Sequence, residues 1–311
     1  MAPVILFSAR QGLWERHEAP LRAALEAAGL GAARLCREAS PETVDYIVYA
    51  PPCPLTDFRP YRRCKAVLSL WAGVEDMVAN PTLTQPLCRM VDPGLRQAMI
   101  EWVVAHTLRH HLGLDAVLAA QNGRWEPRVP PHAPERRVTV FGLGALGAAC
   151  AEALAFLGFD TAGWSRSPRT IEGLTCFHGP EGFPPALARS DIAVVLLPLT
   201  ADTRDLFGAS ALAALPRDAV LLNAGRGALV DDGALLDALD SGQLAHATLD
   251  VFRQEPLPPD HPFWAHPHVT VSPHVAAETN PHTAAPVIAE NVRRGEAGQR
   301  FLHLVDRAAG Y

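Results

Sequence analysis

Three side chains suited to acid–base and anion chemistry lie in the last third of the sequence, each close to a short apolar run. Arg226 lies in "LLNAGRG", Glu255 in "LDVFRQEPLP" and His274 in "VTVSPHVAAET". A guanidinium can bind a carboxylate and polarise the carbonyl next to it, and an imidazole can give or take a hydroxyl proton. A carboxylate can orient that imidazole and raise its pKa. Together they suit a substrate that carries a carboxylate beside a carbonyl or hydroxyl group.

Taken singly, each of these residues also has an ordinary structural explanation. Arg226 could be a surface charge at a strand end, Glu255 a loop charge beside Pro256, and His274 a capped or packed loop histidine. Because a predicted strand precedes each of the three, however, we expect them at the carboxyl edge of one open α/β sheet, where ligands bind.

The remaining histidines and the cysteines show no spacing that predicts a metal site. The stretch "HTLRHH", His106 to His111, is typical of a helix surface or a dimer face, and His261, His266 and His268 lie in a Pro-rich loop without matching Cys or acidic residues. No pair of cysteines has the C-x-x-C spacing of zinc or redox sites, and we expect reduced thiols. The six cysteines are Cys36, Cys53, Cys64, Cys88, Cys150 and Cys176.

A glycine-rich loop in "VTVFGLGALGAACAEALAFLG" predicts a phosphate site. Gly142, Gly144 and Gly147 have G-x-G-x-x-G spacing after a β-branched strand and before an Ala-rich helix. The first glycine permits a tight turn, the second lets the backbone approach a pyrophosphate, and the third allows close packing of helix and strand. Ala145 and Leu146 complete the predicted site at the helix N-terminus, where free N–H groups favour anions. The alternative is a glycine-rich turn without a ligand.

The end of the next strand indicates which dinucleotide would bind. NAD sites usually carry Asp or Glu there for the ribose 2′-hydroxyl, but this chain has Ser165 at that place, followed by Arg166 and Arg169. Arginine suits phosphate recognition, so the sequence favours NADP(H) over NAD(H). Alternatively, the two arginines are solvated surface charges.

Strands and helices alternate along the whole chain, which predicts an α/β fold with two doubly wound, Rossmann-like domains. Residues 4–70 alternate apolar runs with a helix over about 15–28, and one long helix is expected over 94–121, with Met99, Val103, Leu108, Leu112 and Leu118 near one face. The Pro-rich segment 122–137 marks a connection. A second, stronger alternation follows, including a helix over 232–240. A last helix over 284–293 is expected to pack back on the first domain, which makes that domain discontinuous.

Composition excludes several classes of function. The chain of 311 residues is 49% hydrophobic and 19% charged, with a net charge of −6. This acidic balance gives no reason to expect nucleic acid or an anionic membrane as partner. No apolar run is long enough to span a bilayer, and the first residues lack the features of a signal peptide. We therefore expect a cytoplasmic globular protein without a membrane partner.

The order of motifs resembles that of a known family. "GLGALG", "NAGRG", "LDVFRQEPLP" and "SPHVAA" are similar to the D-2-hydroxyacid dehydrogenases, and "AGVE", "WSR" and the closing "VDRAAGY" resemble its glyoxylate/hydroxypyruvate reductase A branch. The resemblance covers essentially the whole chain. It implies a discontinuous, flavodoxin-like substrate domain, residues 1–95 plus 281–311, a dinucleotide-binding domain, residues 96–280, and a homodimer.

The resemblance also implies roles for individual residues. Arg226 would anchor the substrate, His274 would act as acid and base, and Glu255 would be its partner. Backbone N–H groups of Ala72, Gly73 and Val74 would bind the substrate carboxylate, although Trp71 departs from the small residue expected before them. Further cofactor contacts are expected from Leu197, Pro198, Thr203, Ala224, Gly225 and Asp250.

The sequence thus predicts NADPH-dependent reduction of small 2-keto acids such as glyoxylate and hydroxypyruvate. Two alternatives stay open: a dinucleotide-sensing regulatory protein of the same fold, and a dehydrogenase for a bulkier 2-keto acid. The apolar face of the 94–121 helix, with Trp125 beyond it, is expected to form a two-fold interface, and the resemblance suggests that this tryptophan reaches the partner's pocket.

Overall fold

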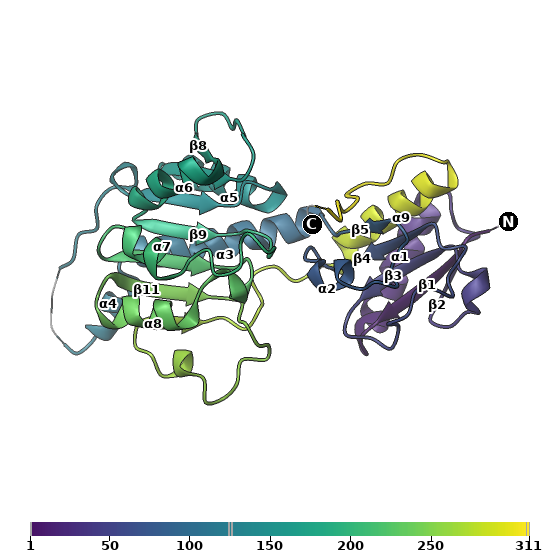
Figure 1. The fold of residues 1–311 in the computed structure, drawn as a ribbon, viewed down its shortest axis with the longest axis horizontal. Helices are drawn as coiled ribbons and strands as arrows, with labels where there is room; N and C mark the ends of the chain where they lie inside the picture. Colours follow the sequence, from purple (N-terminus) through teal and green to yellow (C-terminus); the bar gives the residue numbers. More distant parts are fainter. Residues whose placement is uncertain (1, 124, 126, 309, 311) are drawn as a thin grey trace. The chain divides into compact units, whose positions relative to one another are not determined.

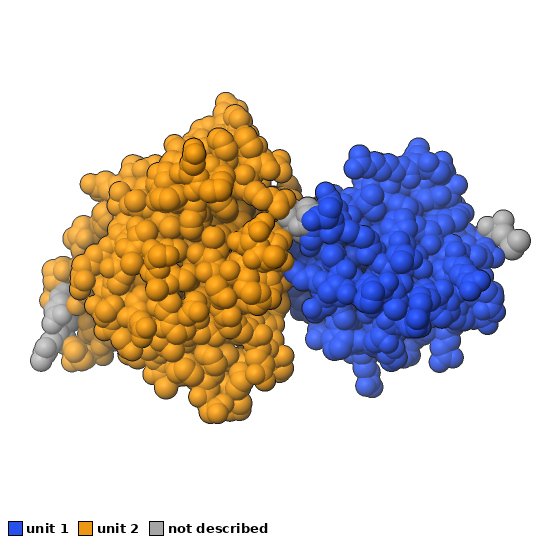
Figure 2. All heavy atoms as spheres, in the orientation of Figure 1, with its two compact units in different colours: residues 1–95, 278–311 blue, residues 96–277 orange. Residues whose placement is uncertain are grey.

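The computed structural model describes residues 2–123, 125, 127–308 and 310. The chain divides into two units, each of which folds around its own parallel sheet (Figure 1). Unit 1 comprises Met1–Leu95 and Glu278–Tyr311, and unit 2 comprises Arg96–Ala277 (Figure 2). The predicted fold class, α/β with a discontinuous first domain, is confirmed. Which unit binds substrate and which binds dinucleotide stays a prediction.

Unit 1 contains five parallel strands in the order β2-β1-β3-β4-β5, which is the flavodoxin-like order. The strands are β1 (Val4–Ala9), β2 (Arg34–Cys36), β3 (Tyr46–Ala50), β4 (Ala66–Ser69) and β5 (Leu87–Cys88). Its helices are α1 (Leu13–Ala27), the short α2 (Glu75–Val78) and α9 (Pro281–Glu296). Every residue of β3 and β4 is buried, as expected for a sheet covered on both faces.

Helix α9 returns the end of the chain to unit 1. Its N-cap is Asn280, whose side chain accepts a hydrogen bond from the backbone N–H of His282. Ile288 and Val292 are fully buried and pack in the same core as Leu21 of α1, and the two helices lie side by side (Figure 1). Each such aliphatic side chain contributes about 1.5–3 kcal/mol on burial, so α9 is an integral part of this unit.

Unit 2 contains seven parallel strands in the order β12-β11-β10-β9-β6-β7-β8. Counted within the unit, this is the Rossmann order 3-2-1-4-5-6 extended by a seventh strand. The strands are β6 (Arg137–Phe141), β7 (Asp160–Ser165), β8 (Thr175–His178), β9 (Ile192–Val195), β10 (Ala219–Asn223), β11 (Leu244–Leu249) and β12 (Val269–Val271). The helices are α3 (Pro93–His111, which begins in unit 1), α4 (Leu114–Ala119), α5 (Ala145–Phe156), α6 (Gly179–Ala188), α7 (Ala209–Ala214) and α8 (Asp232–Asp240).

The single helix expected over 94–121 is wrong, because the chain breaks it in two. Gly113 has a left-handed φ of 63°, which ends α3 and starts α4 in a new direction. Met99 and Val103 of α3 are buried in unit 2, whereas Leu118 of α4 is 66% exposed. The apolar face therefore does not continue as one stripe.

The histidines at the end of α3 are not surface residues as expected. His110 Nε2 lies 2.9 Å from Thr248 Oγ1 of β11, and burial lowers the pKa of His110 to about 3. His111 is only 7% exposed, and its ring meets that of Phe159 edge-on. Both side chains therefore pack within unit 2 in neutral form.

Other features of the described chain concern membranes, metals and cysteines. None of its helices combines the length and apolar character needed to cross a bilayer. Within the same residues, no three His, Cys, Asp or Glu side chains are grouped so that they could hold a metal ion. All six cysteines are free thiols.

Candidate active site

The glycine loop between β6 and α5 has the geometry of a phosphate cradle. Gly142 has a φ of 113°, and a Cβ there would lie 2.6 Å from the carbonyl oxygen of Leu196; a Cβ on Gly147 would overlap the carbonyl of Gly142. The protein itself therefore requires both glycines. A Cβ on Gly144 would meet no protein atom within 4 Å, so packing does not explain that glycine, whereas close approach of a pyrophosphate does. The first turn of α5, which starts at Ala145, presents its N–H groups beside it.

The residues expected to select the dinucleotide lie at the end of β7. Ser165 is buried and its hydroxyl donates a hydrogen bond of 2.8 Å to the carbonyl oxygen of Ser167. Its proton is thus used inside the turn, and the hydroxyl oxygen is left as an acceptor. Arg166 and Arg169 follow with exposed side chains. That the two arginines and the missing carboxylate select the cofactor stays a prediction.

The loops after β9 and β10 lie against each other. The Thr203 hydroxyl donates to the carbonyl oxygen of Pro198 at 2.7 Å and closes the loop after β9. A Cβ on Gly225 would lie 2.9 Å from the carbonyl oxygen of Leu197, so only glycine allows this approach. With Ala224, whose N–H donates to Val195, these predicted cofactor residues gather at the carboxyl edge of the sheet. Whether they touch a cofactor stays a prediction.

His274 and Glu255 form a directly bonded pair. His274 Nδ1 lies 2.6 Å from Glu255 Oε2, and Glu255 Oε1 accepts the backbone N–H of Phe252 at 2.9 Å. A carboxylate at Nδ1 fixes the proton on that nitrogen, so Nε2 is the ring atom that can exchange a proton with a substrate. The His274 side chain is 52% exposed and the Glu255 side chain 34%. The pair is therefore accessible to a small molecule.

The charges around this pair favour its ionised form. The hydrogen bond that His274 donates to Glu255 raises the pKa of His274 above its ordinary value, against the opposing effects of burial and of Arg226. Burial would raise the pKa of Glu255, but the bonds from His274 and Phe252 and the charge of Arg226 lower it overall. An imidazolium paired with a carboxylate is the form that can donate a proton.

Asp250 fixes the loop that carries His274. It is 1% exposed, and its carboxylate accepts the Ser272 hydroxyl at 2.6 Å and the N–H groups of Val275 and Ala276 at 3.0 Å each. Its carbonyl oxygen accepts the N–H of His274, which has a left-handed φ of 54°. The sequence suggested Asp250 as a cofactor contact; this supporting role was missed, although a carboxylate directly after a buried strand was its signal.

Arg226 lies at the end of β10 in a turn that Asn223 holds. The buried Asn223 side chain donates to the carbonyl oxygen of Arg226 at 3.0 Å and accepts the N–H of Gly225 at 3.1 Å. A guanidinium nitrogen of Arg226 donates to the carbonyl oxygen of Gly225 at 2.6 Å. Its charge acts on both His274 and Glu255. The structure thus brings together all three residues predicted for the chemistry, and Asn223 is a positioning residue that the sequence reasoning missed.

The residues predicted to bind the substrate carboxylate lie in unit 1, after β4. Ala72, Gly73 and Val74 precede α2, and within the described chain none of their N–H groups donates a hydrogen bond. Trp71 before them is held by its indole N–H, which donates to the carbonyl oxygen of Pro51 at 3.1 Å, and the guanidinium of Arg10 lies 5.9 Å from its ring. The N–H run is free to bind an anion, and the indole is packed within unit 1.

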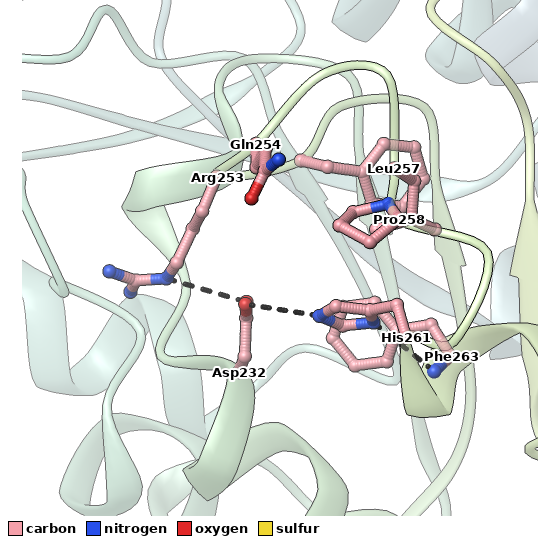
Figure 3. A pocket seen from close by; sticks show the side chains of 8 residues that line it. Asp232, Arg253, Gln254, Leu257, Pro258, His261 and Phe263 are labelled. Atoms are coloured by element: carbon pink, nitrogen blue, oxygen red, sulfur yellow. Dashed lines mark hydrogen bonds and ion pairs between the residues drawn. The ribbon is translucent and has the colours of Figure 1, made fainter.

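A cavity of about 190 Å³ lies in unit 2 beside the segment that carries Glu255. Asp232 bridges two of its walls: its carboxylate lies 3.4 Å from Arg253 Nε and 3.8 Å from His261 Nε2 (Figure 3). Arg226, Glu255 and His274 are not among its lining residues. The lining residues are Asp232, Phe252, Arg253, Gln254, Leu257, Pro258, His261 and Phe263.

Comparison with known proteins agrees with this geometry. Residues 102–276 match the sequence model of the D-isomer specific 2-hydroxyacid dehydrogenase, NAD binding domain. The chain belongs to this family. It is 37% identical to the glyoxylate/hydroxypyruvate reductase A of Yersinia enterocolitica over 287 residues, which cover 89% of this chain and 91% of that protein.

Two solved structures extend the comparison over the whole chain. A D-isomer specific 2-hydroxyacid dehydrogenase from Xanthobacter autotrophicus Py2, in complex with NADPH and MES, is 44% identical with a TM-score of 0.94, and all of each chain is covered. The NADPH-dependent glyoxylate/hydroxypyruvate reductase of Sinorhizobium meliloti, in complex with NADP and sulfate, is 35% identical with a TM-score of 0.89, covering 99% of this chain and 100% of that one.

Proposed function

We propose that this protein reduces small 2-keto acids such as glyoxylate and hydroxypyruvate to 2-hydroxy acids, with NADPH as the hydride donor. The observation that carries the proposal is the His274–Glu255 pair at 2.6 Å with the charge of Arg226 beside it. This arrangement supplies a proton donor and a carboxylate anchor, which are the two groups that keto-acid reduction requires. Membership of the family and the activities named for its relatives support the same reaction.

The residues present fit NADPH. Gly142, Gly144 and the first turn of α5 would hold the pyrophosphate, because Gly144 is the one loop glycine that protein contacts leave unexplained. Arg166 and Arg169 would attract the 2′-phosphate. When bound, the cofactor supplies a hydride to the keto carbon.

The side chains of the chain itself bind, polarise and protonate the substrate. Arg226 would form charge-assisted hydrogen bonds to the carboxylate and polarise the adjacent carbonyl. His274 would then give the proton on Nε2 to the carbonyl oxygen as it becomes a hydroxyl group, while Glu255 holds the proton on Nδ1 and stabilises the imidazolium. The N–H groups of Ala72, Gly73 and Val74 are proposed to bind the same carboxylate.

The test is loss of NADPH absorbance with a panel of keto acids: glyoxylate, hydroxypyruvate, pyruvate and phenylpyruvate. Turnover of glyoxylate and hydroxypyruvate that falls by about 10²- to 10⁴-fold in the matched His274→Asn variant supports the proposal. A clear preference for phenylpyruvate instead assigns a bulkier substrate. Absence of turnover with every acid, while NADPH still binds, contradicts the proposed reaction and favours the dinucleotide-sensing alternative.

We further propose that the enzyme is a homodimer. Exposed apolar side chains gather after α3: Leu114, Val117 and Leu118 of α4, with Trp125 and Val129 following; Trp125 is 95% and Val129 92% exposed. Such a run on one short stretch is typical of an interface. Light scattering at micromolar concentration should give twice the chain mass, and Leu118→Glu should reduce it to one chain. A wild-type monomer would remove the proposal.

A further inference from the structure

The side chain of Arg253 is bonded to the segment that follows Arg226. Its guanidinium donates to Asp205 Oδ1 and to the carbonyl oxygen of Val230, and its Nε lies 3.4 Å from Asp232 Oδ1 (Figure 3). Asp205 belongs to the same assembly, because its N–H donates to the carbonyl oxygen of Ala228 at 2.9 Å. Two of the acceptors, Val230 and Asp232, therefore lie on the segment that follows the Arg226 turn. The third, Asp205, lies on the segment that is hydrogen-bonded to it.

The backbone of Arg253 and of the preceding Phe252 is packed against that turn, and Phe252 also bonds to Glu255. A Cβ on Gly227 would overlap the Phe252 carbonyl and the Arg253 amide, so the two segments touch without space for a methyl group. The N–H of Phe252 then donates to Glu255 Oε1 at 2.9 Å, and Glu255 Oε2 meets His274 Nδ1 at 2.6 Å. Phe252 therefore contacts the anchor turn through its carbonyl group and orients the proton donor's partner, Glu255, through its N–H.

We propose that Arg253 is a positioning residue: its guanidinium clamps the Phe252–Arg253 peptide to the Arg226 turn and thereby sets the alignment of Glu255 with His274. The inference rests on the proposed function, because it names what tunes the proton donor of that reaction. It makes no use of Arg253 as a substrate contact.

The charged groups around His274 and around Arg253 determine the direction in which loss of Arg253 changes the pKa of His274. His274 faces Glu255, Arg226 and Asp250, and its pKa is raised chiefly by the hydrogen bond that it donates to Glu255. Arg253 faces Asp205, Asp231 and Asp232, and beyond Asp232 lies His261.

Removing the guanidinium leaves those carboxylates without their shared cation and frees the 252–253 peptide. Glu255 then loses its fixed orientation, the bond to His274 weakens, and the pKa of His274 falls.

A merely structural role for Arg253 predicts something different. Loss of an anchor in the loop would lower the melting temperature and leave the titration of His274 where it is. The proposed positioning role predicts instead that loss of Arg253 changes the pH at which His274 titrates. It also predicts that kcat and KM both change, since the same clamp supports the proton donor and the Arg226 anchor.

The deciding experiment is an NMR titration of His274 in protein with isotope-labelled histidine, with the signal assigned by its absence in His274→Asn. Arg253→Ala should shift the titration to lower pH, and Arg253→Lys should recover part of the shift because a cation without the planar fork remains. A second variant is Asp205→Asn, because asparagine tolerates the left-handed φ of 55° at this position. It should shift the His274 titration in the same direction by a smaller amount. If Arg253→Ala does not fold, Asp205→Asn is the variant that tests the inference.

The matched control is Arg137→Ala. Arg137 also forms an ion pair, with Asp191 at 2.7 Å, at the amino end of β6. It should lower stability without moving the His274 titration. If Arg253→Ala or Asp205→Asn leaves the titration at its wild-type position, the inference is wrong.

Kinetics separate this failure from failure of the proposed function. For glyoxylate with NADPH, Arg253→Ala should lower kcat/KM by up to about 100-fold, as misplacement of about 1 Å can do, and its alkaline limb should start at lower pH. If Arg253→Ala shifts the His274 titration but the wild-type protein turns over no keto acid, the proposed function alone is overturned. An unshifted titration in an active enzyme would overturn the role of Arg253 alone.

Discussion

We predict that cofactor choice depends on the two exposed arginines that follow β7, and replacing both measures their contribution. Arg166 and Arg169 are solvent-exposed, and the Ser165 hydroxyl proton is used by the carbonyl oxygen of Ser167. A charge-assisted bond is worth about 1.5–3 kcal/mol when shielded, but exposed pairs contribute only about 0.2–1 kcal/mol each. Two exposed arginines therefore give about 0.4–2 kcal/mol, which is a preference for NADPH over NADH of about 2- to 30-fold.

The assay is kcat/KM for both cofactors at saturating keto acid in the wild type and in Arg166→Ala/Arg169→Ala. We expect the double variant to lose most of the NADPH preference, mainly through KM for the cofactor, and added salt to reduce the preference of the wild type. Arg217→Ala is the control, because Arg217 is exposed in the same unit just before β10. A double variant with the wild-type ratio would refute the assignment of these arginines to the 2′-phosphate.

Two further outcomes follow from the site. Arg226→Ala should lower kcat/KM for the keto acid at least tenfold, since a charge-assisted contact worth about 1.5–3 kcal/mol is lost, and Arg226→Lys should recover little; full recovery by lysine would exclude a bidentate anchor. In the proposed reaction the proton donor is the His274 imidazolium, whose pKa is raised chiefly by Glu255, so kcat/KM for reduction should fall as pH rises through that raised pKa. In Glu255→Gln the fall should begin at lower pH, and an unchanged profile would show that Glu255 does not tune His274.

The parts of the fold that local pattern determines were predictable from the sequence. Gly142 and Gly147 are required by close backbone contacts around one β-loop-α unit. Their spacing in the sequence is therefore sufficient to predict the loop. The order of strand-end motifs placed Arg226, Glu255 and His274 at one sheet edge, and the structure brings them together.

Features that depend on distant contacts were not predictable in the same way. His110 has the sequence context of an exposed helix end, yet its partner Thr248 lies 138 residues further along the chain. The break at Gly113 depends on a left-handed φ that a helical apolar pattern does not reveal. Asp250 acts through bonds to backbone N–H groups of the loop after β12, and this loop becomes its neighbour only when β11 and β12 pair.

The measurement that tests the central claim most directly is kcat for NADPH-dependent reduction of glyoxylate by His274→Asn, together with the NADPH dissociation constant of the same variant. Asparagine lacks the acidic Nε2 proton of the imidazolium. The kcat should therefore fall by about 10²- to 10⁴-fold, the range for a lost general acid. The dissociation constant should stay near that of the wild type. A variant that retains near wild-type kcat would contradict the account, because His274 would then not be the proton donor.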